Sequence, residues 1–427
     1  MAIPSPEHCD LLIVGAGPAG MAAALAAAPT GAAITLIDDN PAPGGQIWRD
    51  GPGAHLPRAA LQRREALARH RNVRLLSGTR IVAVPQPKQL LLEDADRGWS
   101  LSYDKLIVCT GARELLLPFP GWTLPGVTGA GGLQALIKGG LPVRGERIVV
   151  AGSGPLLLAV AAAAQAAGAQ VLRVAEQAST GAVAAFAASL VRWPGKALQA
   201  LTLMHPGYRL SSHVVAAAGQ GRVESVRLQQ GARTLDIACD RLACGFGLIP
   251  NTQLGQALGC ALNAQHAIAV DAWQASSLPD HYAAGECTGF GGSERALVQG
   301  AIAGHAAMGQ LDQARQLWPQ RQRWEAFATA LHTRFALHPG LKQLAAPDTL
   351  VCRCEDVSHE QLCGFESWTA AKLHSRCGMG ACQGRVCGGA TQFLFGWPQP
   401  APRTPISPAR IATLALNADA SKLKSPT

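Results

Sequence analysis

The sequence predicts an α/β protein with two nucleotide-binding units and a small cysteine-rich module near its C-terminus. Two glycine-rich loops carry the first part of this prediction, because each one follows a short apolar run and precedes an alanine-rich stretch. The loops lie at residues 15–20 and 152–155. Six of the twelve cysteines fall between residues 352 and 387 and predict the separate module. Together these features favour two Rossmann-like domains joined to a metal-binding segment.

Composition supports a compact protein and excludes several classes of function. Among the 427 residues, 48% are hydrophobic and only 15% are charged, which is typical of a well-buried globule. The net charge of +9 is spread along the chain without a Lys/Arg block, so we expect no nucleic-acid partner. A basic docking face for an acidic partner, or a solvated surface, explains the charge better. We expect a cytoplasmic protein without a membrane span, since the N-terminus lacks a leader pattern and apolar runs stay short.

The first unit begins with a predicted strand at Asp10–Val14, followed by the glycine loop, a helix and a second strand at Ala33–Ile37. Glycines in such a loop let the backbone turn tightly and approach a pyrophosphate, and an acid at the end of the second strand can bind a ribose. Asp39 is the alternative acid. The predicted contacts of this unit are Gly15, Gly17, Gly20 and Asp38.

Three further segments decide which nucleotide the first unit binds. A glycine pair follows the acid within residues 41–46, a strand at 106–112 ends in a Thr-Gly turn, and a strand at 282–286 ends in a carboxylate. Each places small or polar groups where a second part of a long cofactor would lie. The predicted contacts are Gly45, Gln46, Thr110, Gly111, Gly285 and Glu286.

With these segments the chain resembles the two-dinucleotide-domain flavoproteins that include thioredoxin-reductase-like enzymes. The resemblance implies that FAD occupies the first unit, with Thr110–Gly111 near the cofactor and Glu286 on the ribityl chain. Members of the family more often carry Asp where this chain has Glu286, so the departure affects the geometry of that contact.

The second unit repeats the pattern with strands at Ile148–Ala151 and Gln170–Val174. Leu157 stands where a third small residue would allow close packing of helix and strand, and Glu176 is the candidate acid. The sequence leaves three states open for this unit: a nicotinamide nucleotide, another adenine nucleotide, or no ligand.

The cysteine-rich segment predicts a four-thiolate [2Fe-2S] site. Its C-x-C and C-x4-C pairs can each present two sulfurs from a short loop. Tetrahedral zinc is the competing metal, although C-x-C is unusual in its structural sites. The chain contains no C-x-x-C pair, which argues against a disulfide reductase. The predicted ligands are Cys352, Cys354, Cys377 and Cys382, with Cys387 as the first substitute and Cys363 as a spare thiol.

Residues 351–387 resemble the bacterioferritin-associated-ferredoxin-like module fused to FAD-containing α subunits of heteromeric amino-acid and opine dehydrogenases. That family is the hydrogen cyanide synthase, opine oxidase and D-hydroxyproline dehydrogenase type. Segments 117–127 and 152–158 resemble the same subunits, so the likeness extends over roughly residues 8–400. It implies a partner FAD-containing β subunit of D-amino-acid-oxidase type that oxidises the substrate. An FMN at a subunit interface and a small ferredoxin-like γ subunit are further features that the resemblance allows.

The predicted function is that of an electron-transferring oxidoreductase subunit that works with its partner on CH-NH donors: an amino acid, an imino acid such as D-hydroxyproline, or an opine. The alternatives are a stand-alone NAD(P)H-dependent reductase that passes electrons to a protein acceptor, and a non-enzymatic docking or sensing protein. No histidine or acid is indicated as a catalytic base, so no catalytic residue is predicted. The predicted divisions are 1–116 with 240–310 for FAD, 117–239 for the second unit, 311–349 as a helical connector, 350–400 as the [2Fe-2S] module and 401–427 as the tail.

Overall fold

The computed structural model describes residues 7–398 and 400–422. The first unit is built on a seven-stranded sheet of order β3-β2-β1-β6-β5-β4, with β17 beside β6. Strands β1, β2, β3, β6 and β17 run parallel, and β4 and β5 form antiparallel pairs. The strands are β1 (Glu7–Val14), β2 (Ile34–Ile37), β3 (Val73–Leu76), β4 (Arg80–Gln86), β5 (Gln89–Glu93), β6 (Gly98–Val108) and β17 (His281–Ala283).

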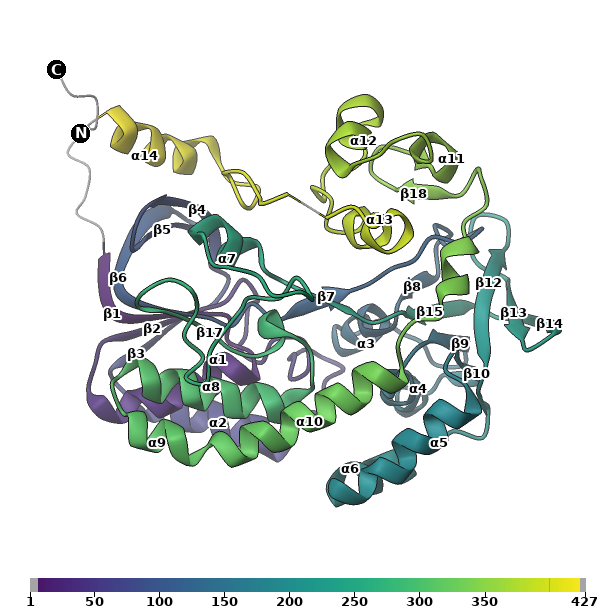
Figure 1. Ribbon diagram of the computed structural model, residues 1–427, viewed down its shortest axis with the longest axis horizontal. Helices are drawn as coiled ribbons and strands as arrows, with labels where there is room; N and C mark the ends of the chain where they lie inside the picture. Colours follow the sequence, from purple (N-terminus) through teal and green to yellow (C-terminus); the bar gives the residue numbers. More distant parts are fainter. Residues whose placement is uncertain (1–6, 399, 423–427) are drawn as a thin grey trace.

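Helices cover this sheet because its central strands are apolar on both faces. Helices α1 (Pro18–Ala27), α2 (Arg58–Arg69) and α8 (Ser293–Ala307) lie together below the sheet in Figure 1. The axes of α1 and α8 approach closely, since a Cβ added at Gly300 would lie 2.1 Å from the Ala19 carbonyl oxygen. This contact brings the segment after β17 against the first glycine loop, although the two are far apart in sequence.

The second unit has a five-stranded parallel sheet of order β11-β10-β9-β15-β8 and a separate antiparallel sheet of order β12-β13-β14. Its strands are β8 (Val127–Gly129), β9 (Arg147–Gly152), β10 (Gln170–Glu176), β11 (Tyr208–Arg209), β12 (Ser212–Ala218), β13 (Ser225–Gln230), β14 (Arg233–Ala238) and β15 (Arg241–Gly245). Its helices are α3 (Ala130–Lys138), α4 (Leu156–Ala166), α5 (Thr180–Ser189) and α6 (Pro194–Thr202). Helix α3 lies within residues 118–145, where the many prolines and glycines predict turns and crossings rather than long elements.

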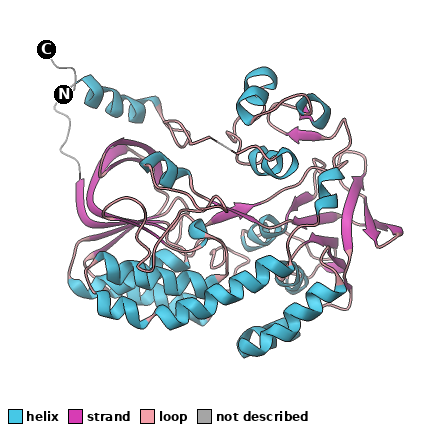
Figure 2. Ribbon diagram, viewed as in Figure 1, coloured by secondary structure: helices cyan, strands magenta, loops and turns pink. Residues whose placement is uncertain are grey.

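Two crossing segments join the units. Strands β7 (Ala112–Glu114) and β16 (Leu248–Pro250) pair as an antiparallel ribbon between the sheets. Figures 1 and 2 show this ribbon near the centre of the molecule, with long helices below it and the chain from about residue 350 onward above it. Beyond β16, the short helix α7 (Gln253–Leu258) returns the chain to the first unit.

The connector consists of α9 (Leu311–Gln316) and α10 (Trp318–Arg334), followed by a 3-10 turn at Pro339–Gln343. In Figure 1, α10 runs from the helices of the first unit toward α4 and α5 of the second. Phe327 is buried against Phe186 and Trp193, so this part of α10 belongs to the core.

The cysteine module has its own core and lies above the ribbon in Figure 1. Its elements are β18 (Leu350–Cys352), β19 (Val357–Ser358), α11 (His359–Leu362), α12 (Trp368–Ser375) and α13 (Cys387–Phe395). The tail then crosses to the first sheet, where α14 (Ile411–Lys422) packs beside β4 and β5. Thr413 Oγ1 donates a buried hydrogen bond to Glu93 Oε2 at 2.6 Å. Within the described residues, no helix combines the length and apolarity needed to cross a membrane.

Candidate cofactor sites

The first glycine loop is shaped so that two of its positions exclude any side chain. Gly15 has a φ of +101°, and a Cβ there would lie 2.3 Å from the Cys109 carbonyl oxygen. A Cβ at Gly20 would lie 1.8 Å from the Gly15 carbonyl oxygen. Helix α1 follows at once with Gly17 as its N-cap, and no side chain caps it. The free N–H groups of this first turn are suited to a pyrophosphate.

Asp38 lies at the end of β2, beside the loop, and only 6% of it is exposed. Its Oδ2 accepts a hydrogen bond from the Ala16 backbone N–H at 2.6 Å, and its Oδ1 accepts one from the Asn40 N–H at 2.8 Å. The carboxylate thus fixes the loop at the place where a ribose would lie. The alternative acid, Asp39, has an exposed side chain.

The glycine pair after Asp38 folds back over the loop. The Gly44 N–H donates to the Ala16 carbonyl at 2.8 Å, and a Cβ at Gly45 would lie 3.1 Å from the Gly17 Cα. Gln46 is exposed, and its Oε1 accepts a hydrogen bond from Arg49 Nη2 at 2.9 Å. Gly45 therefore lies over the loop, and Gln46 lies at the surface beside it.

Thr110 and Gly111 form the turn between β6 and the ribbon. Thr110 Oγ1 donates to the Asn251 carbonyl at 2.6 Å, and Asn251 Nδ2 donates to the Thr110 carbonyl at 3.0 Å. Gly111 has a φ of +69°, which glycine adopts without strain. Asn251 was not singled out by the sequence. Its position directly after the β16 strand is the signal that could have revealed it.

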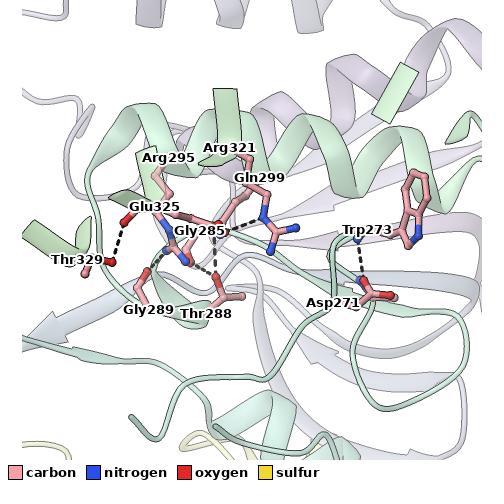
Figure 3. Close-up of polar contacts among 11 residues, drawn as sticks. Asp271, Trp273, Gly285, Thr288, Gly289, Arg295, Gln299, Arg321, Glu325 and Thr329 are labelled. Atoms are coloured by element: carbon pink, nitrogen blue, oxygen red, sulfur yellow. Dashed lines mark hydrogen bonds and ion pairs between the residues drawn. The ribbon is translucent and has the colours of Figure 1, made fainter. Parts of the chain in front are cut away.

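The last predicted segment, Gly285–Glu286, rests on a polar network from α8 (Figure 3). Gln299 is fully buried, and its Oε1 accepts from the Gly285 N–H at 3.0 Å and from Thr288 Oγ1 at 3.2 Å. Burial raises the pKa of Glu286, and nearby Arg295 opposes that shift. Arg295 in turn donates to the Gly289 carbonyl.

These residues fit a flavin dinucleotide. The buried Nε2 of Gln299 and Nε of Arg295 have no hydrogen-bond partner in the described part of the chain, as expected beside a polar ligand. FAD, when bound, supplies the reversible redox chemistry. The chain supplies backbone N–H groups at α1, glycine surfaces that admit the cofactor, and a carboxyl group at each strand end.

The second loop has the same plan, and its acid is still more deeply buried than Asp38. Glu176 is 0% exposed, and its oxygens accept from the Gly154 N–H at 2.7 Å and from the Ala178 N–H at 2.9 Å. Burial raises the pKa of Glu176 to about 7. Leu157 is also fully buried and would contact a Cβ placed at Gly245. Both the acid and the unusual leucine are thus part of the core.

The connector covers this second loop. Ser153 Oγ donates to the Phe335 carbonyl at 2.8 Å, and Gln177 Nε2 donates to the Ala336 carbonyl at 3.0 Å. The His338 N–H donates to Gln177 Oε1 at 3.0 Å. Segment 335–338 therefore binds both the glycine loop and the residue after the acid, where a nucleotide would be held.

The cysteine module gathers three thiols in its interior. The sulfurs of Cys352, Cys377 and Cys387 all lie within 4.8 Å of one another, and all three residues are buried. Hydrogen bonds from the other two thiols lower the pKa of Cys352 to about 2. The bond with Cys352 raises the pKa of Cys377 to about 12, and bonds with both other thiols raise the pKa of Cys387 still further. A metal ion would replace the protons that the three sulfurs now share.

Two more predicted ligands lie at the outer side of this group. Cys354 is exposed and interacts with the backbone and thiol of Cys382, which is partly exposed. Of the predicted set, Cys352 and Cys377 therefore belong to the inner group and Cys354 and Cys382 to an outer pair. The inner group also includes Cys387, and Cys363 is exposed beside His359. Soft sulfur donors of this number suit an iron-sulfur centre and also suit zinc.

Residues 9–314 match the model of the family described as pyridine nucleotide-disulphide oxidoreductase. The chain belongs to the pyridine nucleotide-disulphide oxidoreductase family. Membership in this flavoprotein family explains why two glycine loops share one chain.

Family relatives extend over the cysteine module as well. The HcnB component of hydrogen cyanide synthase from Pseudomonas aeruginosa is 33% identical over 93% of this chain and 96% of its own length. An opine oxidase component from Agrobacterium tumefaciens is 32% identical over 96% of this chain and 92% of its own length. Both relatives are subunits of oxidoreductases, so the resemblance to this type of protein is confirmed.

Solved structures within the same fold agree. L-proline dehydrogenase from P. horikoshii superposes with a TM-score of 0.68, covering 96% of this chain and 80% of that chain at 18% identity. Thioredoxin reductase from T. acidophilum gives a TM-score of 0.55, covering 71% of this chain and 99% of that chain at 21% identity. The predicted fold class, two Rossmann-like domains of thioredoxin-reductase type with a small C-terminal module, is confirmed.

Proposed function

We propose that this chain is the electron-transferring α subunit of a heteromeric dehydrogenase, with FAD in the first unit and a [2Fe-2S] cluster in the cysteine module. One observation carries the proposal: buried thiols converge in a module that packs against a flavoprotein fold in the same chain. A flavin accepts electrons in pairs and a cluster accepts them singly, so the combination suits transfer to one-electron acceptors.

The relatives support the proposed substrate class. Their names describe subunits of hydrogen cyanide synthase and opine oxidase, which supports a CH-NH donor here: an amino acid, an imino acid such as D-hydroxyproline, or an opine. Substrate oxidation then takes place in a partner FAD-containing β subunit of D-amino-acid-oxidase type. The proposal also includes a cytoplasmic location, an FMN at a subunit interface and a small ferredoxin-like γ subunit.

The proposed cofactor contacts divide among the chain's own residues by position. The glycine loop and Asp38 hold the pyrophosphate and ribose, Thr110–Gly111 borders the flavin, and Glu286 binds the ribityl chain. The cluster takes four thiolates, from Cys352 and Cys377 of the inner group and from Cys354 and Cys382 of the outer pair, with Cys387 as the substitute for one of them.

The second unit weighs against a stand-alone NAD(P)H-dependent reductase. Segment 335–338 contacts Ser153 of its glycine loop and Gln177 directly after its acid. A nicotinamide nucleotide would have to displace these contacts before it could bind. Electrons are therefore expected to enter from the partner.

The test is to purify the chain alone and with the candidate β subunit, and to assay both with amino acids, imino acids including D-hydroxyproline, and opines. We expect the chain alone to contain flavin and iron but to reduce no dye with any substrate, and the complex to reduce the dye. Robust oxidation by the isolated chain, or a preparation without flavin and iron, would contradict the proposal.

A pair of serine substitutions tests the cluster. Cys352→Ser should remove the cluster's visible absorption and electron paramagnetic resonance signal, because Cys352 lies at the centre of the inner thiol group. Cys363→Ser is the matched control, since this exposed thiol belongs to the same module but lies outside that group. Iron content and the resonance spectrum of both variants are measured at equal flavin content. Zinc in place of iron in the wild type would contradict the assignment.

A further inference from the structure

The cysteine module is docked on the ribbon that joins the two units. Arg113 of β7 pairs with Ile249 of β16 in the ribbon. A Cβ added at Gly389 of α13 would lie 2.1 Å from Ile249 Cδ1, so the helix that begins at Cys387 lies directly on the ribbon. The inner thiol group is therefore fixed close to the strand that starts just after Thr110 and Gly111.

Hydrogen bonds connect this turn to the cysteine module. Asn251 Nδ2 donates to the Thr110 carbonyl at 3.0 Å, and Arg113 Nη1 donates to Asn251 Oδ1 at 3.2 Å. Arg113 Nε then donates to the Arg385 carbonyl at 3.1 Å. Arg385 is two residues before Cys387, so a short series of contacts runs from the Thr110 turn to an inner thiol.

Charge adds to this arrangement. The side chain of Arg113 is held between the ribbon and the module, and burial together with the neighbouring Arg385 lowers the pKa of Arg113 to about 10. The guanidinium is therefore still charged at neutral pH. Arg385 Nη2 donates to the Ile406 carbonyl of the tail at 2.9 Å, which holds the second cation in place. Positive charge beside a cluster favours its reduced, more negative state.

We propose that Arg113 is a positioning residue for electron transfer, which holds the Arg385–Cys387 segment against the Thr110–Asn251 end of the first unit. The inference rests on the proposed function. FAD held by the first unit would supply electrons that a CH-NH donor delivers through the partner subunit, and a cluster held by the cysteine module would accept them one at a time. Arg113 contributes a fixed distance and a positive charge to this step.

The test uses the full chain with its cofactors and the variants Arg113→Met and Arg113→Lys. A light flash in the presence of EDTA reduces the flavin, and the loss of the cluster's visible absorption then gives the transfer rate. We expect Arg113→Met to slow this rate by at least about ten-fold, since small displacements of a fixed geometry are costly. It should also shift the cluster's midpoint potential to a more negative value. Arg113→Lys should keep the wild-type midpoint potential of the cluster, because lysine keeps the positive charge. It should still show a slowed electron-transfer rate, because lysine lacks arginine's fixed pair of donors.

Arg241→Met is the matched control, because Arg241 is also a half-buried arginine but pairs with Glu146 in the second unit. It should leave both rate and potential unchanged. Equal rates in the wild type and Arg113→Met, at equal flavin and iron content, would overturn the inference. If Arg113→Met loses its cluster, Asn251→Ala decides: a slowed rate supports the proposal and an unchanged rate overturns it. A wild type without flavin or cluster would instead refute the proposed function.

Discussion

The two glycine loops of this chain share one local design and differ in what covers them. In the first unit, Asp38 accepts a hydrogen bond from the loop, and the glycine pair that follows this acid lies over the loop. In the second, Glu176 makes the equivalent bond from full burial, and the connector's Phe335 carbonyl accepts a hydrogen bond from the loop's Ser153. The first loop is contacted by residues that closely follow its acid, and the second by a segment that is distant in the sequence.

The strand–loop–helix pattern alone therefore does not establish a nucleotide site. The pattern fixes a turn and an acid within about 25 residues, which is a local property. Whether a ligand can enter depends on the segment that packs over the loop, and here that segment is more than 150 residues away in the sequence. Substitutions in each of the two loops test this difference.

The largest expected effect comes from matched substitutions in the two loops. Gly15→Ala should abolish FAD binding and lower the free energy of unfolding by more than about 3 kcal/mol, because its Cβ would overlap the Cys109 carbonyl at a positive φ. Gly154→Ala has a similar φ of +95° but only a 3.9 Å contact with the Phe335 ring, so flavin content should stay normal. Flavin absorption per chain and denaturant unfolding measure both. Loss of flavin in Gly154→Ala would remove the distinction.

A pH effect of comparable size is expected from Glu176. The pKa of this carboxyl is raised to about 7 in the folded chain, above its ordinary value of 4.5, so the folded state binds a proton that the unfolded state releases. The protonated carboxyl contributes about 3 kcal/mol to the free energy of unfolding below pH 4.5. This contribution is lost as the pH rises to about 7.

Urea unfolding across this pH range should therefore show a slope that Glu176→Gln flattens. Glu224→Gln, a change at an exposed carboxylate of the same unit, is the control and should keep the wild-type slope. An unchanged slope in Glu176→Gln would mean that the second loop does not bury a protonatable acid.

The smallest effect is expected at the connector. Phe335→Ala removes an edge-on contact with Phe186, whose ring centroid is 5.1 Å away. It should lower the free energy of unfolding by about 1–2 kcal/mol, because the Phe335 side chain is only partly buried. Phe365→Ala is the control, because it also removes a partly buried ring but from the cysteine module.

Calorimetric titration with NADH should show no saturable binding to the wild type. Tight binding there, or rapid bleaching of the flavin by NADH, would show that the second loop is open.

Much of the fold follows from local sequence signals. Strands β1, β2, β9 and β10 begin and end within a few residues of the predicted positions, because buried apolar runs bounded by glycine loops specify them. Helix α3 was not expected, since glycines and prolines surround it. Its buried face, formed by Ala130, Leu133 and Ile137, packs on the second sheet and stabilises it despite that composition.

The candidate sites likewise combine features that local sequence predicts with features that depend on packing. Spacing identified the glycines, Asp38 and the group of cysteines. It could not show that Cys387 joins Cys352 and Cys377 in the interior, because α13 brings Cys387 into the module only when it folds. Nor could it reveal Gln299, whose burial under Gly285 depends on the packing of α8 against α1.

The sequence by itself determined the two loops, the acids that follow them, the absence of a C-x-x-C pair and the clustering of thiols, since each depends on residues close together in the chain. The tertiary structure alone decided that the connector covers the second loop and that Arg113 contacts the cysteine module. The physical reason is that contacts between distant segments depend on how whole elements pack, and no local spacing records that.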